Sequence, residues 1–148
     1  MTSASTLAAR IDRNESLRDL GLLLLRLILG VVFIYHGGQK LFGLFGGYGL
    51  EATAGAFGSM GIPFPMASAI AAGSAEFFGG ILLILGLFFR PAAFIMAFTM
   101  FVATYTHLPN GFPAPKGVEF PLTLAIGLLT LALTGAGRIS LGKLLWRK

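Results

Sequence analysis

Long apolar stretches separated by short polar segments run along most of the chain. A helix needs about 20 residues, at 1.5 Å per residue, to cross the hydrocarbon core of a bilayer. Four stretches come close to or exceed that length, at residues 20–42, 66–89, 91–108 and 118–135. The pattern therefore predicts an all-α integral membrane protein folded as a four-helix bundle.

The segments between the predicted spans differ in length and composition. The Arg90-Pro91 pair predicts a tight turn between the second and third spans, with Pro91 as the first residue of the third helix. Residues 43–65 form a longer glycine-rich loop, in which we expect a short interfacial helix around residues 50–60. Residues 109–117 hold three prolines and are expected to be irregular.

The spans form a single expected domain, residues 20–141, between an N-terminal segment, 1–19, and a basic tail, 142–148. Apolar residues interleaved with charges suggest that the N-terminal segment is amphipathic and lies on the membrane surface; they are Leu7, Ile11, Leu17 and Leu20. The alternative is that this segment is a flexible tail.

The composition agrees with a membrane location. Of 148 residues, 55% are hydrophobic and 11% are charged, whereas about 25% are charged in soluble domains. The formal net charge is +5, but the basic residues are spread between apolar runs, which argues against nucleic-acid binding. There is no cysteine, which excludes disulfides, thiolate metal sites and thiol redox chemistry within this chain.

The distribution of lysine and arginine predicts the orientation. One side of the predicted bundle receives Arg10, Arg13, Arg18, Arg90, Arg138, Lys143, Arg147 and Lys148, and the other receives only Lys40 and Lys116. Cytoplasmic loops carry the excess of positive charge. Both termini are therefore expected in the cytoplasm, with loops 43–65 and 109–117 facing outward.

Ionisable residues inside the spans are the candidate chemistry, since each costs about 2.5–3.5 kcal/mol at the bilayer centre and needs a partner or a function. Counted from the inner end of each span, Arg26 lies at roughly 9 Å, Glu76 at roughly 20 Å and Lys40 near 30 Å. Arg26 is expected to reach towards Glu76.

Three further ionisable residues lie at the same predicted depth, roughly 24 Å from the inner end of their spans. They are His36, His107 and Glu119, on three different spans. Gln39 and Lys40 share a helix face with His36, because they lie three and four residues after it. We therefore predict a polar pocket in the outer half of the bundle. Its candidate catalytic residues are Glu76, His36, His107 and Glu119, and its candidate binding residues are Arg26, Gln39 and Lys40.

Structural interpretations of the same residues remain open. Arg26 and Glu76 could be a buried pair that fixes helix register, and Lys40 could be an anchor whose charge reaches the interface. The histidines could be interfacial hydrogen-bonding residues, paired haem ligands, or, together with Glu119, ligands of a transition metal.

The residues resemble those of a known family. The run LRLILGVVFIYHGGQKLFG at residues 25–43 is similar to the first span of DoxX-family membrane proteins. Further similarities are Glu76 followed by FFGG, the Arg90-Pro91 pair, His107, and the GAGRISL run at residues 135–141. Gly142 departs from the acidic residue expected there in many relatives.

The resemblance implies a four-span protein of the bacterial inner membrane. Family members are linked to quinone-coupled oxidation of sulfur compounds, to defence against oxidative stress and to resistance against quinones and catechols, while distant relatives act in export or assembly. The first hypothesis is therefore a redox-associated subunit that takes a quinone in the outer pocket and works with a redox partner protein. The alternative is a non-enzymatic module, a small-molecule binder, carrier or assembly partner. The glycine-rich faces of the first two spans are also compatible with a homo-oligomer.

Overall fold

The computed structural model describes residues 3–145, with side chains described from residue 13 onward. Every regular element in this part of the chain is a helix. The elements are α1 (Ser3–Phe42), η1 (Leu44–Gly46), α2 (Gly49–Ser59), α3 (Pro65–Leu85), α4 (Phe89–His107), η2 (Leu108–Asn110), α5 (Glu119–Thr134) and α6 (Leu141–Leu145). The predicted all-helical fold is confirmed.

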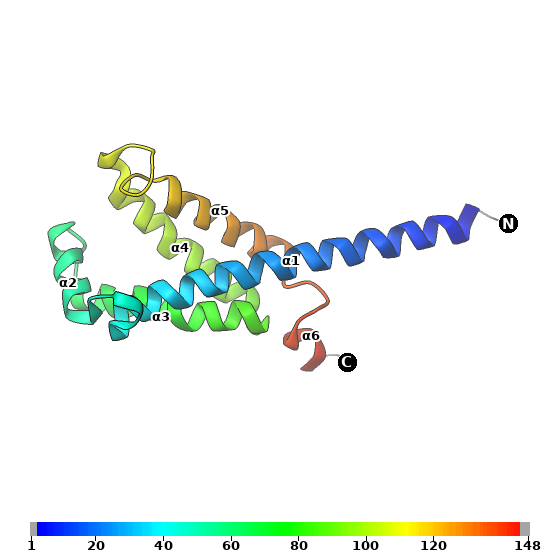
Figure 1. The fold of residues 1–148 in the computed structure, drawn as a ribbon, viewed down its shortest axis with the longest axis horizontal. Helices are drawn as coiled ribbons and strands as arrows, with labels where there is room; N and C mark the ends of the chain where they lie inside the picture. Colours follow the sequence, from blue (N-terminus) through cyan, green and yellow to red (C-terminus); the bar gives the residue numbers. More distant parts are fainter. Residues whose placement is uncertain (1–2, 146–148) are drawn as a thin grey trace.

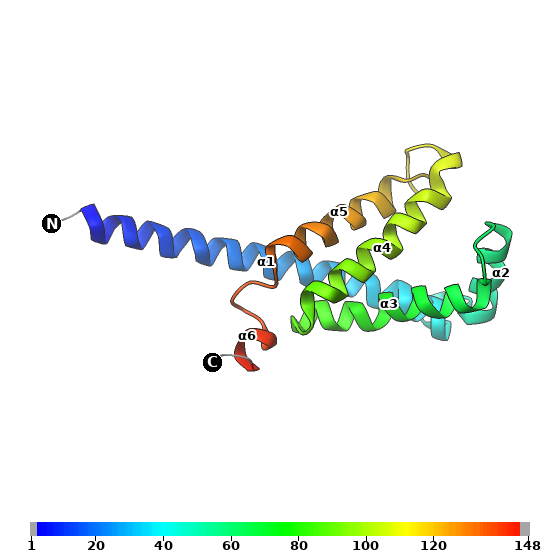
Figure 2. The same ribbon diagram turned by 180° about the vertical axis from the view of Figure 1, so that it is seen from behind.

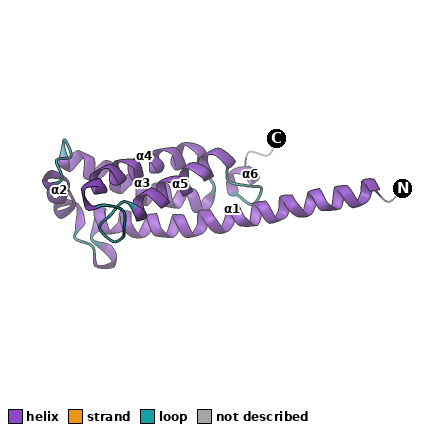
Figure 3. Cartoon of the chain, turned by 90° about the horizontal axis from the view of Figure 1, so that it is seen from above, coloured by secondary structure: helices purple, strands orange, loops and turns teal. Residues whose placement is uncertain are grey.

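The long helices form two antiparallel pairs. Helix α1 packs along α3, and α4 packs along α5. The pairs lie close together near α6 and diverge towards α2, so that the molecule has the outline of a V (Figures 1 and 2). Seen from above, the four helices share one long axis and α1 projects beyond the others (Figure 3). The open end of the V is the end predicted to face outward.

Glycine allows α1 and α3 to approach closely. A Cβ atom on Gly30 would lie 2.5 Å from the Ile84 side chain and 2.9 Å from the Gly80 carbonyl oxygen. A Cβ atom on Gly37 would lie 2.8 Å from the Cα atom of Phe77. Small residues are favoured where membrane helices pack, because lipid provides no hydrophobic drive for association. From the sequence, a homo-oligomer is an open interpretation of these glycine-rich faces. In the structure the two faces contact each other within one chain.

The buried apolar core lies where the two helix pairs meet. Its central side chains are Phe33 of α1, Leu83 of α3, Met96 of α4, and Leu128 and Leu131 of α5. The outer surfaces of the same helices are also apolar, with exposed residues such as Ile28, Phe98 and Leu133. A helix that is apolar all round suits the interior of a bilayer.

Two helices, Pro65–Leu85 and Phe89–Asn110, are long and apolar enough to cross a membrane, and α5 is a shorter apolar helix. The other two of the four expected spans stay predictions. Residues 3–19 differ from expectation, because they continue α1 without a break instead of forming a separate segment. The side chains of Leu7 and Ile11, and the basic end at residues 146–148, lie outside the described part.

The turn between α3 and α4 lies earlier than predicted. Gly86 ends α3 in a left-handed conformation, with φ at 68°, and its N–H donates to the carbonyl of Leu82 at 2.8 Å. Helix α4 therefore begins at Phe89, and Pro91 is its third residue rather than its first. The expected helix near residues 50–60 is present as α2.

Candidate binding cavity

A cavity of about 560 Å³ occupies the open part of the V. Its wall comes from α1, α2, α3, α4 and α5 and from the loops at residues 62 and 115. Most of the lining side chains are apolar, and the polar ones include His36, Lys40, Glu76 and His107. A mainly apolar cavity with a few polar groups is typical of a site for a small organic ligand.

Lys40 and Glu76 form an ion pair on the wall of this cavity. The Nζ atom of Lys40 lies 2.5 Å from the Oε2 atom of Glu76, and the Glu76 side chain is 2% exposed. Gly73 on α3 permits the close approach of the helices here, since a Cβ atom on Gly73 would lie 2.8 Å from the side chain of Leu41, the residue after Lys40. Lys40 is therefore a partner of Glu76, and not an anchor that reaches out to the interface.

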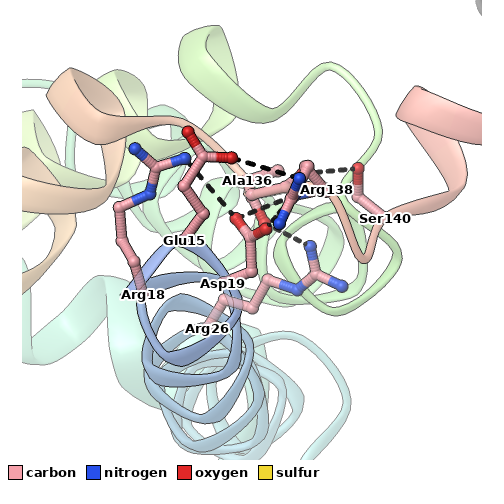
Figure 4. Close-up of polar contacts among 8 residues, drawn as sticks. Glu15, Arg18, Asp19, Arg26, Ala136, Arg138 and Ser140 are labelled. Carbon is pink, nitrogen blue, oxygen red and sulfur yellow. Dashed lines mark hydrogen bonds and ion pairs between the residues drawn. The ribbon is translucent and has the colours of Figure 1, made fainter. Parts of the chain in front are cut away.

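Arg26 does not approach Glu76, and the predicted pair is wrong. Its guanidinium donates to the carbonyl oxygen of Ala136 at 2.7 Å and to that of Ile139, in the loop after α5 (Figure 4). The physical reason is distance: Arg26 lies 14 residues before Lys40 on α1, about 21 Å along the helix axis. The Nε atom of Arg26 has no hydrogen-bond partner among the described residues.

The two histidines reach the cavity from different helices. His36 lies one turn before Lys40, and its ring packs at 5.9 Å from the ring of Phe120 on α5. His107 ends α4, and its Nδ1 atom lies 2.7 Å from the carbonyl oxygen of Ala103. Because a carbonyl only accepts, Nδ1 carries the proton in that contact, which leaves Nε2 of the neutral ring as an acceptor.

Two predicted site residues do not line the cavity. Glu119 accepts a hydrogen bond from the Ala114 backbone N–H at 2.8 Å, which stabilises the loop before α5. Gln39 donates to the Phe45 carbonyl at 3.3 Å. The structure thus brings together His36, Lys40, Glu76 and His107, but not Arg26, Gln39 or Glu119. The described part of the chain has no group of three His, Cys, Asp or Glu side chains that could hold a metal ion. The alternative transition-metal site with His36, His107 and Glu119 is therefore not formed there.

The apolar part of the wall was missed from the sequence. Phe57 and Met60 close the cavity from α2 and the residue after it, and Phe120 closes it from α5. One signal was available on α3, where a run of small residues surrounds the cavity side of Glu76: Ser68, Ala71, Ala72 and Ala75. Small side chains at these positions leave the space that the cavity occupies.

A separate polar cluster joins α1 to the loop after α5 at the other end of the molecule (Figure 4). The Nε atom of Arg138 lies 2.6 Å from Asp19 Oδ2, and Arg138 Nη1 lies 3.1 Å from Glu15 Oε2. Asp19 is 2% exposed. The hydrogen bond from the Arg138 side chain is the main cause that holds the pKa of Asp19 below its ordinary value of 3.8.

Comparisons with known proteins identify one family and several similar proteins. Residues 21–108 match the DoxX family. The chain is 37% identical to "Putative oxidoreductase CatD" of Bacillus subtilis, over 83% of this chain and 85% of that protein. It is 33% identical to "Inner membrane protein YphA" of Escherichia coli, over 85% of this chain and 91% of YphA.

A second Escherichia coli protein, "Inner membrane protein YqjF", is 31% identical over 90% of this chain and 98% of its own length. No solved structure matches the chain. The family match covers more than half of the chain, and the relatives are similar over nearly their whole lengths. The chain therefore belongs to the DoxX family.

Proposed function

We propose that this protein is a redox-associated subunit of the bacterial inner membrane that binds a quinone in the cavity between its two helix pairs. The observation that carries the proposal is the apolar cavity of about 560 Å³ with Lys40, Glu76 and two histidines on its wall. Its size lies within the usual range for small-ligand sites, about 300–1,000 Å³. The names of the relatives, one "Putative oxidoreductase" and two "Inner membrane protein", support the same assignment.

The residues present fit a quinone, which is an apolar ring with polar oxygens. The aromatic wall, with Phe33, Phe57 and Phe120, would hold the ring. The ammonium of Lys40 and the ring of His36 would donate hydrogen bonds to its oxygens. When bound, a quinone supplies two-electron chemistry that takes up two protons.

Proton movement is the part of that chemistry that this chain's own residues can carry. A proton that the Lys40 ammonium gives to a quinone oxygen would be replaced through Glu76, whose Oε2 atom lies 2.5 Å from Lys40 Nζ. His107 would take up a proton at Nε2 and pass it on to the ligand, because Nδ1 donates to the Ala103 carbonyl. Electrons would come from a redox partner protein or from a diffusing donor.

One observation favours the alternative, a non-enzymatic binder, carrier or assembly partner. Arg26, Gln39 and Glu119 hydrogen-bond to the backbone outside the cavity. The cavity therefore holds fewer polar groups than the sequence predicts, and its apolar wall would suit a lipophilic molecule that undergoes no reaction.

The test is a titration of the purified full chain with a short-chain quinone. We expect His36→Ala to weaken binding about tenfold, since a hydrogen bond to a buried polar group is worth about 1–2 kcal/mol. Gln39→Ala is the matched control, because Gln39 lies three residues away on α1 and donates to the Phe45 carbonyl. Wild-type protein that fails to bind the quinone, or equal affinity of His36→Ala and wild type, would exclude this function. Binding without reduction in the presence of an electron donor would favour the alternative.

A further inference from the structure

A second hollow lies at the end of the molecule opposite the cavity, where the turn between α3 and α4 meets the loop after α5. Its volume is about 590 Å³. Arg18 of α1, Arg90 of α4 and Lys143 of α6 contribute to its wall, together with the backbone at residues 134–137. None of these residues takes part in the function proposed above.

The hollow carries excess positive charge. Four basic residues line it, and Asp19 is the one acidic residue among them. Asp19 is already paired, because Arg138 Nε lies 2.6 Å from its Oδ2 atom. The side chains of Arg90 and Lys143 make no hydrogen bond or ion pair with any residue that the structure describes. Their charge is thus available to an anion.

A buried positive charge behind the wall of the hollow makes its electrostatic potential more positive. Arg26 is 3% exposed and its guanidinium binds two carbonyl groups rather than a carboxylate, so its positive charge is not neutralised there. Helix α4 also begins at the hollow and has no side-chain cap. Its N-terminus therefore contributes the positive end of the helix dipole.

Apolar side chains near the hollow distinguish a lipid from a free anion. Phe88, Leu144 and Leu145 are 66%, 67% and 65% exposed. Phe88 lines the hollow itself, and the two leucines follow Lys143 on α6. The predicted first span begins at residue 20, two residues after Arg18, so we expect the hollow at the depth of lipid headgroups. A free anion would gain nothing from these apolar groups.

We propose that this hollow binds the phosphate of an anionic membrane lipid, with Arg90 and Lys143 as its ligands. The guanidinium of Arg90 suits the phosphate oxygens because it can donate two parallel hydrogen bonds, and the Lys143 ammonium adds a point charge. The acyl chains would then lie over Phe88 and the leucines of α6. This assignment is independent of the quinone proposal.

The experiment measures which lipid the detergent-purified full chain retains from an equimolar mixture of phosphatidylglycerol and phosphatidylcholine, by native mass spectrometry. We expect wild type to prefer phosphatidylglycerol, and Arg90→Gln or Lys143→Gln each to lower the preference about fivefold, which corresponds to about 1 kcal/mol per basic residue. Lys116→Gln is the control, because Lys116 is an exposed basic residue in the loop before α5, at the opposite end.

An unchanged preference in the Arg90→Gln, Lys143→Gln double variant would overturn the proposal. So would displacement of phosphatidylglycerol by an equal concentration of inorganic phosphate, which would identify a free-anion site. If Arg90→Gln loses helicity, Lys143→Gln alone decides, since Lys143 is exposed on the short helix α6.

Discussion

Asp19 illustrates how one side chain can join distant parts of this chain. It lies on α1 but receives hydrogen bonds from both the side chain and the backbone N–H of Arg138, 119 residues away, at 2.6 Å and 3.2 Å. The ionised carboxylate accepts both bonds more strongly than the protonated acid, because both of its oxygens are then free acceptors and carry negative charge. Glu15 contacts the same arginine at 3.1 Å but is 41% exposed, so solvent screens that pair more strongly.

The lowered pKa of Asp19 predicts acid-sensitive stability. A carboxyl whose folded pKa lies below its unfolded value stabilises the fold above the unfolded value, here about 3.8, and loses that contribution as the pH falls through the folded pKa. We expect Asp19→Asn to unfold at a lower temperature than wild type at neutral pH, and the difference to shrink below about pH 3.8. Thermal unfolding followed by circular dichroism in detergent measures it.

Glu15→Gln provides the comparison for this prediction, since it removes the exposed partner of the same arginine. Its effect at neutral pH should be smaller than that of Asp19→Asn. A difference between Asp19→Asn and wild type that stays constant from neutral pH down to pH 3 would show that the ionised carboxylate does not stabilise the fold.

Residue depth was predictable from the sequence, but side-chain partners were not. Counting along each span placed His36, His107 and Glu119 at one level; the two histidines line one cavity, whereas Glu119 does not. It paired Glu76 with Arg26, whereas Lys40 is the actual partner. The cause is that depth says nothing about how far one helix slides along another, and the glycine contacts between α1 and α3 set that register.

At the scale of elements, the contact between α1 and α3 places both Lys40 and Glu76. Each of the two helices has a pair of glycines seven residues apart, which is about two helical turns. The pairs are Gly30 and Gly37 on α1 and Gly73 and Gly80 on α3. One face of each helix is therefore free of side chains at two levels. The helices approach closely there, and this approach brings the ion pair together.

Gly37→Ala tests this contact. The new Cβ atom would meet the backbone of Phe77, with 2.8 Å to its Cα atom, and backbone cannot rotate away. We expect a loss of about 1–3 kcal/mol in the free energy of unfolding, the usual cost of overpacking. Gly21→Ala on the same helix has no neighbour within 4 Å and should be neutral or stabilising by about 0.5–1 kcal/mol. Equilibrium unfolding in mixed micelles compares the two, and equal effects would contradict the role of Gly37.

Helix positions were predicted better than helix ends. The apolar stretches at 66–89, 91–108 and 118–135 correspond to α3, α4 and α5. Gly86 ends α3 earlier than the hydrophobic pattern does, because Leu87 and Phe88 continue the pattern outside the helix. Hydropathy alone does not separate a helical residue from an apolar residue in a turn.

On the scale of the whole molecule, the V shape divides the chain into two ends of different character. The open end has the apolar cavity, α2 and the loop after α4, while the narrow end has α6 and the basic hollow (Figure 1). The two described chain ends, residues 3 and 145, both lie away from the open end. This arrangement agrees with a bundle that places both termini on one side of a bilayer.

The distribution of lysine and arginine predicts that both termini lie on the cytoplasmic side of the membrane. Because the chain has no cysteine, single introduced cysteines can test this orientation by labelling. Single cysteines can replace exposed residues at the two ends, Ser59 and Lys116 at the open end and Lys143 at the narrow end. On intact spheroplasts, a membrane-impermeant maleimide should label Ser59→Cys and Lys116→Cys at once, and Lys143→Cys only after lysis. Labelling of Lys143→Cys alone before lysis would mean the opposite orientation, and it would place the cavity between the helix pairs on the cytoplasmic side. Labelling at both ends before lysis would contradict a four-span bundle altogether.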